Sequence, residues 1–233
     1  MYEIEERTVV LPVRVREASS VYASFLVPAV AVKRLLPAGL IPLQTVPGRA
    51  TCTIVGVDYK EGDLGQYFEL GVCFLLRPPN GSRLDLVSMM RNQAPAYIHR
   101  LPVTTSFSCE AGRHIWGFPK SVMDIEFADT DAMRTVTLRD DGRLVLQLSA
   151  PRGGTKTFSN VDIDAMGSWG GPVQVTPAQM AGEGVKAGFR AGQLALGDHP
   201  IADELRTLGL PKKPLIAGTI ERFTGSFDEA HPL

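Results

Sequence analysis

The sequence predicts a single, mainly β domain with two or three short helices. Segments rich in Val, Ile, Leu, Thr and aromatic residues, separated by turn residues, dominate the 233-residue chain. Helix signals are few and short, and no internal repeat or low-complexity linker divides the chain. The composition is 44% hydrophobic and 21% charged, which provides a sizeable core and argues against disorder. We therefore expect one mostly antiparallel domain over residues 1–233.

The clearest strand signal is a hairpin. Residues 134–139 and 143–148 flank the turn sequence Asp140-Asp141-Gly142. Apolar residues alternate with others along both arms, as expected for a strand with one buried face: they are Val136, Leu138, Leu144, Leu146 and Leu148. Further strands are expected at residues 8–15, 51–59, 66–76 and 215–223.

Two short helices are expected. Residues 28–36 begin with Pro28 and end before Pro37 and Gly39. Residues 199–208 have Asp198 as the expected N-cap and end before Gly209. The Gly/Pro-rich residues 152–188 are expected to be rich in loops.

Charge and cysteine usage restrict the class of protein. Twenty-four basic and 25 acidic residues leave a net charge of −1, and no block of like charge indicates a nucleic-acid or membrane surface. The acidic N-terminal region does not resemble a signal peptide. Cys52, Cys73 and Cys109 are scattered, as expected for reduced thiols. We expect a cytoplasmic protein.

Generic catalytic and cofactor motifs are absent from the sequence. The four histidines are far apart, so no metal motif appears, and there is no P-loop or GxSxG elbow. Gly182, Gly184 and Gly188 miss the dinucleotide fingerprint by one residue and are interpreted as loop residues. We expect neither a metal ion nor an organic cofactor.

One segment, residues 112–121, carries more specific chemistry. Lys120 follows Phe118-Pro119 directly, and Trp116 is close by. Pro119 restricts the backbone before the lysine, and the aromatic side chains provide apolar walls. Loss of hydration disfavours an ammonium ion, and a neutral amine attacks a carbonyl carbon to form a Schiff base. The alternative is an ordinary exposed lysine after a turn proline.

The residues of this segment resemble the active-site signature of the acetoacetate decarboxylase superfamily: Gly112-Arg113, then Trp116-Gly117-Phe118-Pro119-Lys120. Two further stretches follow the family's order. Residues 35–40 resemble the end of its first helix, and Asp58-Tyr59 with residues 65–69 resembles the segment that carries its active-site glutamate. The similarity is good over residues 8–150 and looser in the C-terminal third.

This resemblance implies a closed, cone-like antiparallel β-barrel around an apolar cavity, in a protein that forms homo-oligomers. It also implies that Lys120 forms a Schiff base with a ketone or keto acid. The decarboxylase itself is an established example of a lysine activated by an apolar pocket or by a cationic neighbour.

The sequence departs from the decarboxylase pattern at several positions. The second active-site lysine is replaced by Ser121, and the glutamate after Arg113 is replaced by His114. The N-terminal arginine of the family falls on Ala18, with Arg16 nearby but out of register. A second acidic residue falls on Ile54. These differences argue against acetoacetate decarboxylation while leaving Schiff-base chemistry in place.

Lys120 and Glu69 are the predicted catalytic residues. Glu69 is either a cavity carboxylate that moves protons at the substrate α-carbon or an outward-facing strand residue. Arg113 either holds a substrate carboxylate or bonds loop carbonyls. If the segment is extended, at most one of Arg113 and His114 faces the cavity. The other predicted substrate-binding residues, each with ordinary core packing as the alternative, are Tyr67, Tyr97, His99, Trp116 and Ser121.

The sequence therefore predicts a Schiff-base-forming lyase that acts on a small keto acid or ketone through Lys120. The reaction is either decarboxylation or aldol condensation–dehydration. The alternative is a non-catalytic barrel that binds an apolar small molecule. Both interpretations expect a small-molecule ligand and a homo-oligomer, with no nucleic-acid or membrane partner.

Overall fold

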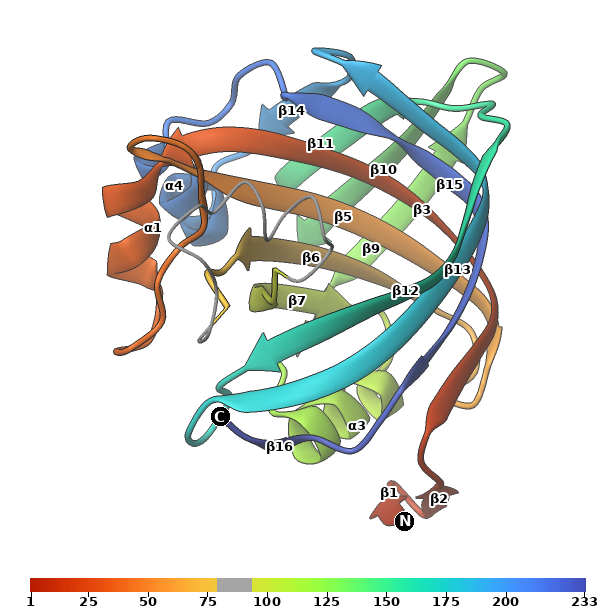
Figure 1. Cartoon of the computed structure of the whole chain (residues 1–233). Helices are drawn as coiled ribbons and strands as arrows, with labels where there is room; N and C mark the ends of the chain where they lie inside the picture. The colour runs from red at the N-terminus through yellow and green to blue at the C-terminus, as the bar shows by residue number, and fades with distance from the viewer. Residues whose placement is uncertain (79–93) are drawn as a thin grey trace.

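Two β-sheets make up most of the molecule, and the larger one is strongly curved (Figure 1). The computed structural model describes residues 1–78 and 94–233. The main path of the larger sheet runs, in spatial order, through β12 (Lys156–Gly167), β13 (Gln174–Phe189), β15 (Ile216–Phe227), β3 (Val13–Pro28), β5 (Arg49–Gly62), β6 (Tyr67–Leu75), β7 (Ala96–Val103) and β8 (Lys120–Val122). The short strands β4 (Gln44–Val46) and β16 (His231–Pro232) pair with β5 and β13.

The smaller sheet contains four strands, and a separate hairpin lies at the N-terminus. The four strands are, in order, β14 (Gln193–Leu196), β11 (Arg143–Pro151), β10 (Met133–Asp140) and β9 (Asp124–Asp129). The N-terminal hairpin consists of β1 (Tyr2–Ile4) and β2 (Arg7–Val9). The described helices are α1 (Ala29–Leu35), α3 (Ser106–Trp116) and α4 (Pro200–Thr207). The predicted mainly β, single-domain fold with a few short helices is confirmed.

The two sides of the curved sheet meet where β12 pairs with β7 in parallel. Ala165 pairs with Ala96, and Met166 pairs with Tyr97. The pairings that run from β12 through β13, β15, β3, β5 and β6 to β7 therefore lead back to β12. This short parallel contact brings the strands that carry the site around a common interior.

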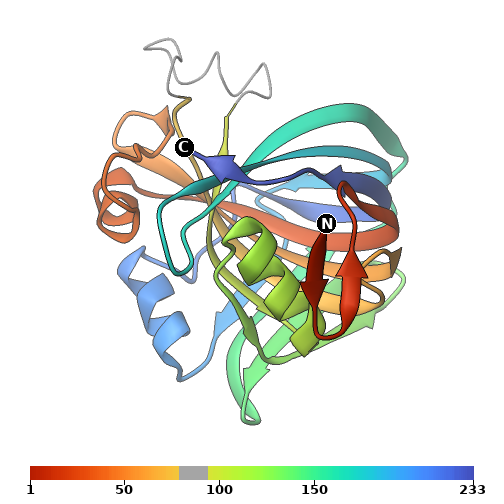
Figure 2. The same ribbon diagram turned by 90° about the horizontal axis from the view of Figure 1, so that it is seen from below.

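Both faces of the larger sheet are covered by other elements. The smaller sheet, α1 and α4 pack on the outer face, whereas α3 and the N-terminal hairpin lie on the inner side (Figures 1 and 2). The outer core includes Phe25, Ile54, Leu70, Phe74, Val136, Leu138, Leu146 and Leu205. The inner core includes Val15, Tyr59, Tyr67, Leu101, Val103, Phe107, Ile115 and Trp116.

Strand β3 contributes to both cores because its alternation changes phase. Val13 and Val15 face the inner core, whereas Val21 and Phe25 face the outer core. All four positions are odd, so a regular strand would place them on one face. The register with β5 shifts around Glu17, and this bulge turns the following side chains over.

The predicted hairpin of β10 and β11 and the helix α1 are present close to their expected positions. The predicted strand at residues 8–15 is interrupted, with β2 ending at Val9 and β3 beginning at Val13. Pro12 lies in the break, where its missing N–H provides no ladder hydrogen bond. Helix α4 is capped by the His199 side chain, which accepts from Ile201 N at 3.2 Å, so the predicted Asp198 cap is wrong.

The prediction that residues 152–188 are rich in loops is wrong. They contain β12 and most of β13, which pair along nearly their whole length. Much of β12 is exposed or half-buried, so it lacks the apolar alternation that marks a strand. Gly182, Gly184 and Gly188 lie on β13. Gly182 lies so close to the Phe158 ring that a Cβ there would overlap it.

No helix in the described part of the chain has the length and apolar character needed to cross a membrane.

Candidate active site

Helix α3 and the turn after it place Lys120 at the site. The Thr105 hydroxyl oxygen caps the helix by accepting from Ser108 N at 3.3 Å. The helix stops at Gly117, whose φ of 64° lies in the left-handed region that glycine adopts without strain. Pro119 then prevents the helix from continuing, and Lys120 opens β8, which runs parallel to β7. The condition of an extended segment around Arg113 and His114 does not apply, because both residues are helical.

Gly112 makes room on α3 for the lysine side chain. A Cβ atom at this position would overlap Lys120 Cδ and Cε. Glycine inside a helix costs up to about 1 kcal/mol relative to alanine. This glycine lets the aliphatic part of Lys120 pass against the helix backbone, so the signature residue has a direct steric role.

Arg113 holds the backbone of the lysine and lies outside the cavity lining. Its Nε donates to the Lys120 carbonyl oxygen at 2.9 Å, and Nη1 donates to Glu110 at 3.1 Å. Its guanidinium also lies 4.9 Å from the centre of the Trp169 ring. Of the two roles considered for Arg113, this placement matches the structural one and corrects the substrate-binding assignment.

The Lys120 amine is buried against a carboxylate. Only 3% of the Lys120 side chain is exposed, and Nζ lies 2.7 Å from Glu69 Oε2. The other oxygen, Oε1, accepts a hydrogen bond from the Tyr59 hydroxyl at 3.1 Å. Glu69 therefore points into the interior, and its outward-facing alternative does not apply. The Glu69 carboxylate therefore contacts the Tyr59 hydroxyl through one oxygen and the Lys120 amine through the other.

Tyr59 and Tyr67 form an aromatic wall beside this pair. Their rings stack with centroids 4.4 Å apart, and Lys120 Nζ lies 5.2 Å from the Tyr67 ring centre. Burial, together with the nearby Glu69 carboxylate, raises the pKa of both phenols well above the ordinary value. Tyr59 is therefore protonated at neutral pH and acts as a hydrogen-bond donor.

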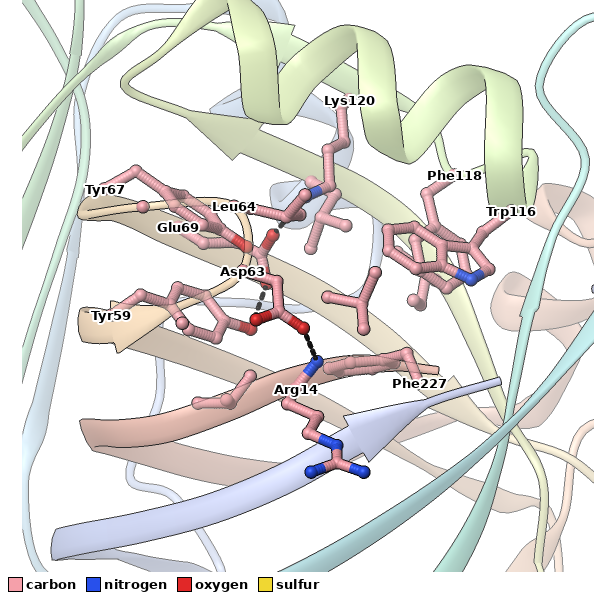
Figure 3. Close-up of a pocket in the computed structure, with 16 residues that line it drawn as sticks. Arg14, Tyr59, Asp63, Leu64, Tyr67, Glu69, Trp116, Phe118, Lys120 and Phe227 are labelled. Atoms are coloured by element: carbon pink, nitrogen blue, oxygen red, sulfur yellow. Dashed lines mark hydrogen bonds and ion pairs between the residues drawn. The ribbon is translucent and has the colours of Figure 1, made fainter. Parts of the chain in front are cut away.

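These groups face an apolar cavity of about 60 Å³ (Figure 3). This is several times the space of about 10–15 Å³ that one buried water molecule needs, so the cavity has room for a small organic molecule. Its apolar walls are Val13, Val15, Leu64, Ile98, Leu101, Trp116, Phe118 and Phe227. Lys120 enters from the side of α3, and Trp116 and Phe118 stand beside it as predicted. The arrangement suits attack of an amine on a small carbonyl compound.

Tyr97, His99 and Ser121 are not brought into this cavity. Tyr97 bonds to Ser168 at 2.8 Å, and His99 bonds to Glu204 of α4 at 2.8 Å on the outer face. Alternation along β7 explains this, because Ile98 between them faces inward. Ser121 follows Lys120 in β8 and is absent from the lining. The predicted substrate contacts of these three residues are therefore corrected.

The positions that depart from the family pattern lie outside the cavity lining. Arg16 donates to Asp63 Oδ1 at 2.6 Å, and Arg14 N donates to Asp63 Oδ2 at 2.8 Å. Ala18 is fully buried in the inner core, and Ile54 is fully buried in the outer core. Arg16 is thus tied to the loop after β5 and does not replace the N-terminal arginine in the lining.

Sequence reasoning missed the site roles of Tyr59 and Gly112. The signal for Tyr59 is its position opposite Tyr67 in the pairing of β5 with β6. Tyr67 lies two residues before Glu69. Glu69 and Tyr67 share a face of β6, so their β5 partner lies on the same face. Gly112, eight residues before Lys120, is a weaker signal. Its contact with the lysine side chain can be inferred only once the helix α3 is known.

The geometry agrees with the comparison to known families. The family model described as acetoacetate decarboxylase matches residues 5–229.

The chain belongs to the acetoacetate decarboxylase family.

Solved structures of low sequence identity share the family's fold. Acetoacetate decarboxylase from Legionella pneumophila superposes with a TM-score of 0.71 at 13% identity, covering 95% of this chain and 87% of that one. The enduracididine biosynthesis enzyme MppR, solved with the condensation product of pyruvate and imidazole 4-carboxaldehyde, gives 0.66 at 15% identity, covering 98% and 92%. An acetoacetate decarboxylase-like enzyme from Sphingomonas wittichii RW1 gives 0.59 at 12% identity, covering 97% and 94%. No curated protein matches the chain.

Proposed function

We propose that this protein is a Schiff-base-forming lyase that acts on a small ketone or keto acid through Lys120. The observation that carries the proposal is the buried Lys120 amine, 2.7 Å from the Glu69 carboxylate and open to an apolar cavity. Membership of the acetoacetate decarboxylase family supports the same chemistry. The curved sheet, whose pairings return to β12, supports a closed, cone-shaped barrel around this site.

The first step needs a neutral amine. Glu69 takes one proton from the Lys120 ammonium, and the freed lone pair attacks the substrate carbonyl carbon. The carbonyl oxygen takes up the proton held by Glu69 and a second proton from the attacking nitrogen and leaves as water, and an iminium joins the substrate to Nζ. The Tyr59 hydroxyl, which donates to Glu69, helps to orient the carboxylate toward the amine.

The iminium then accepts electrons from a bond at the adjacent carbon. Loss of CO₂ from a 3-keto acid, or loss of an α-proton to Glu69, gives an enamine. The enamine either takes up a proton or attacks a second carbonyl carbon in an aldol step, which dehydration can follow. The Legionella decarboxylase and the MppR complex with a condensation product support both branches as candidates.

The apolar walls favour a second candidate, a protein that binds a small apolar molecule without turnover. Eight apolar side chains line the cavity. This candidate does not need the buried amine and carboxylate, whose burial is costly unless they pair. It therefore ranks below the enzyme.

Reductive trapping tests the proposal. The protein is incubated with cyanoborohydride and a panel of ketones, aldehydes and 2-oxo acids, and the Lys120 peptide is examined by mass spectrometry. We expect substrate mass on Lys120, and no such adduct in Lys120→Ala or Lys120→Arg. Equal trapping by wild type and both variants at other lysines would overturn the proposal. Binding without any adduct would favour the second candidate.

A further inference from the structure

The charges in the interior of the cavity balance one another before any substrate enters. The charged lining residues are Arg14, Asp63, Glu69 and Lys120. Lys120 forms an ion pair with Glu69 in the interior, and Arg16 forms an ion pair with Asp63 at the mouth. When Lys120 becomes an iminium its positive charge is kept, so Glu69 still neutralises it. The interior of the cavity therefore provides no surplus positive charge, and the remaining positive charge belongs to Arg14 at the mouth.

The neighbouring arginines do not supply one. Arg14 is exposed, and in Figure 3 its guanidinium points away from Lys120. Arg16 is bound to Asp63, and Arg113 is bound to the Lys120 carbonyl and Glu110 outside the cavity. Among the residues that the structure describes, Lys120 is thus the cation that faces the interior.

Several neutral donors near the cavity are already occupied. The Trp116 indole N–H donates to the Asp228 carbonyl at 2.8 Å. The Tyr59 hydroxyl donates to Glu69. At the mouth, Arg14 N donates to Asp63, and Gly65 N donates to the Gly62 carbonyl at 3.1 Å. A substrate carboxylate would therefore lose its hydration without gaining these hydrogen bonds.

We propose, on the basis of the Schiff-base function above, that the substrate bound to Lys120 is an uncharged carbonyl compound, a short ketone or aldehyde. A carboxylate in a cavity of about 60 Å³ would lie among apolar walls and close to the Glu69 carboxylate. Burial of an unpaired charge beside a like charge is strongly unfavourable. An uncharged carbonyl compound avoids both the burial of an unpaired charge and the repulsion from Glu69.

This substrate class selects the aldol branch, because decarboxylation needs a substrate carboxylate. The amine of Lys120 and the ketone form an iminium and release water. Glu69 removes one α-proton, and the C–H electrons form the enamine. The enamine carbon attacks an aldehyde carbonyl, a C–C bond forms, and the new alkoxide takes the proton from Glu69. Water then hydrolyses the iminium, which frees the β-hydroxy ketone and restores the amine.

The test compares butan-2-one with pyruvate, which are close in size and differ in charge. Each rate of cyanoborohydride trapping at Lys120 is divided by the rate for Nα-acetyl-lysine under the same conditions, which removes intrinsic reactivity. We expect the normalised rate for butan-2-one to exceed that for pyruvate by about tenfold or more. Pyruvate trapping equal to or faster than butan-2-one after this correction would overturn the inference.

A variant shows whether the discrimination is electrostatic. Glu69→Gln removes the negative charge and keeps the shape, so the ratio of butan-2-one to pyruvate trapping should fall by about tenfold even if both rates decrease. Glu61→Gln removes the same charge from an exposed position of β5 and should leave the ratio unchanged. A ratio that falls equally in both variants, or in neither, would overturn the electrostatic explanation.

The outcomes separate this inference from the proposed function. Absence of Lys120-dependent trapping with every carbonyl compound would contradict the Schiff-base function itself. Lys120-dependent trapping that favours pyruvate would leave that function standing and reject the uncharged substrate.

Discussion

Lys120 and Glu69 stabilise each other in the resting protein, and in the proposed reaction they exchange a proton. A buried ammonium without a partner is costly, and so is a buried carboxylate, but the 2.7 Å pair offsets both costs. The same contact lets the carboxylate receive the proton when the amine becomes a nucleophile. The missing second lysine does not disturb this pair, because Ser121 lies outside the cavity lining.

Gly112→Ala should separate folding from activity. Alanine improves helix propensity by up to about 1 kcal/mol, so α3 should tolerate it. The added Cβ would overlap Lys120 Cδ and Cε, and the flexible lysine side chain must move away. We expect an unchanged or slightly higher melting temperature with Lys120 trapping reduced at least about tenfold. Gly171→Ala is the control, since a Cβ there meets nothing within 4 Å. Wild-type trapping by Gly112→Ala would show that the lysine does not need this space.

Tyr59→Phe should impair proton transfer more than folding. The ring and its stacking on Tyr67 stay, but Glu69 Oε1 loses a hydrogen bond worth about 1–3 kcal/mol. We expect the rate of α-deuterium exchange into butan-2-one, measured by NMR, to fall by about tenfold or more. Tyr22→Phe removes a comparable hydrogen bond to the Lys186 carbonyl and should leave exchange unchanged. Equal effects of the two variants would indicate general destabilisation instead of positioning.

At the level of elements, the end of α3 and the short parallel strand β8 position Lys120. The residues of the signature have local structural roles in this turn. The sequence grouped Lys120, Trp116 and Phe118 because their chemistry and spacing are distinctive, and all three line the cavity. It did not show α3, whose moderate apolar character is interrupted by Gly112 and polar residues. It also misplaced Tyr97 and His99, because aromatic and histidine residues suit either face of β7 and only the pairing of the strand decides between them.

The Glu204 carboxylate of helix α4 bonds to His99 and Arg100 of β7, and this contact gives a pH-dependent contribution to the free energy of unfolding. Burial opposes ionisation of Glu204, but hydrogen bonds from His99 and Arg100 lower its pKa from 4.5 to about 2. Because the folded-state pKa is lowered, the stabilisation is present above about pH 4.5 and is lost as the pH falls toward 2.

Glu204→Gln should therefore be most destabilising near neutral pH. We expect a loss in the free energy of unfolding of about 3 kcal/mol at most at pH 6, shrinking steadily below pH 4.5, in urea titrations. Asp203→Asn is the control, because its pair with Arg206 is exposed on the same helix. A Glu204→Gln effect that is constant from pH 6 to pH 2.5 would contradict the assignment.

For the whole molecule, composition and turn spacing were sufficient for the mainly β fold but not for its curvature. The hairpin of β10 and β11 was predictable because its buried face alternates strictly. The long strands β12 and β13 were not, because they are held largely by main-chain pairing with half-exposed side chains. Contacts such as β7 with β12 join residues about 70 positions apart, and no local pattern encodes them.

Assembly and location stay predictions of the sequence. We expect at least a dimer, on the family resemblance, and light scattering across a wide concentration range measures this directly. A monomer mass throughout that range would refute the expectation.

The two faces of the larger sheet should respond differently to the same kind of substitution. Leu146 is fully buried in the outer core, so Leu146→Ala should cost about 2–5 kcal/mol in urea unfolding without changing which ketone is trapped by the folded protein. Ile98 lies on the cavity wall, so Ile98→Ala should enlarge the site and favour longer ketones. Each additional buried CH₂ contributes about 0.8 kcal/mol, which is roughly fourfold in relative trapping rate from butan-2-one to pentan-2-one. If Leu146→Ala shifts the ketone preference and Ile98→Ala does not, the inner face does not form the substrate site.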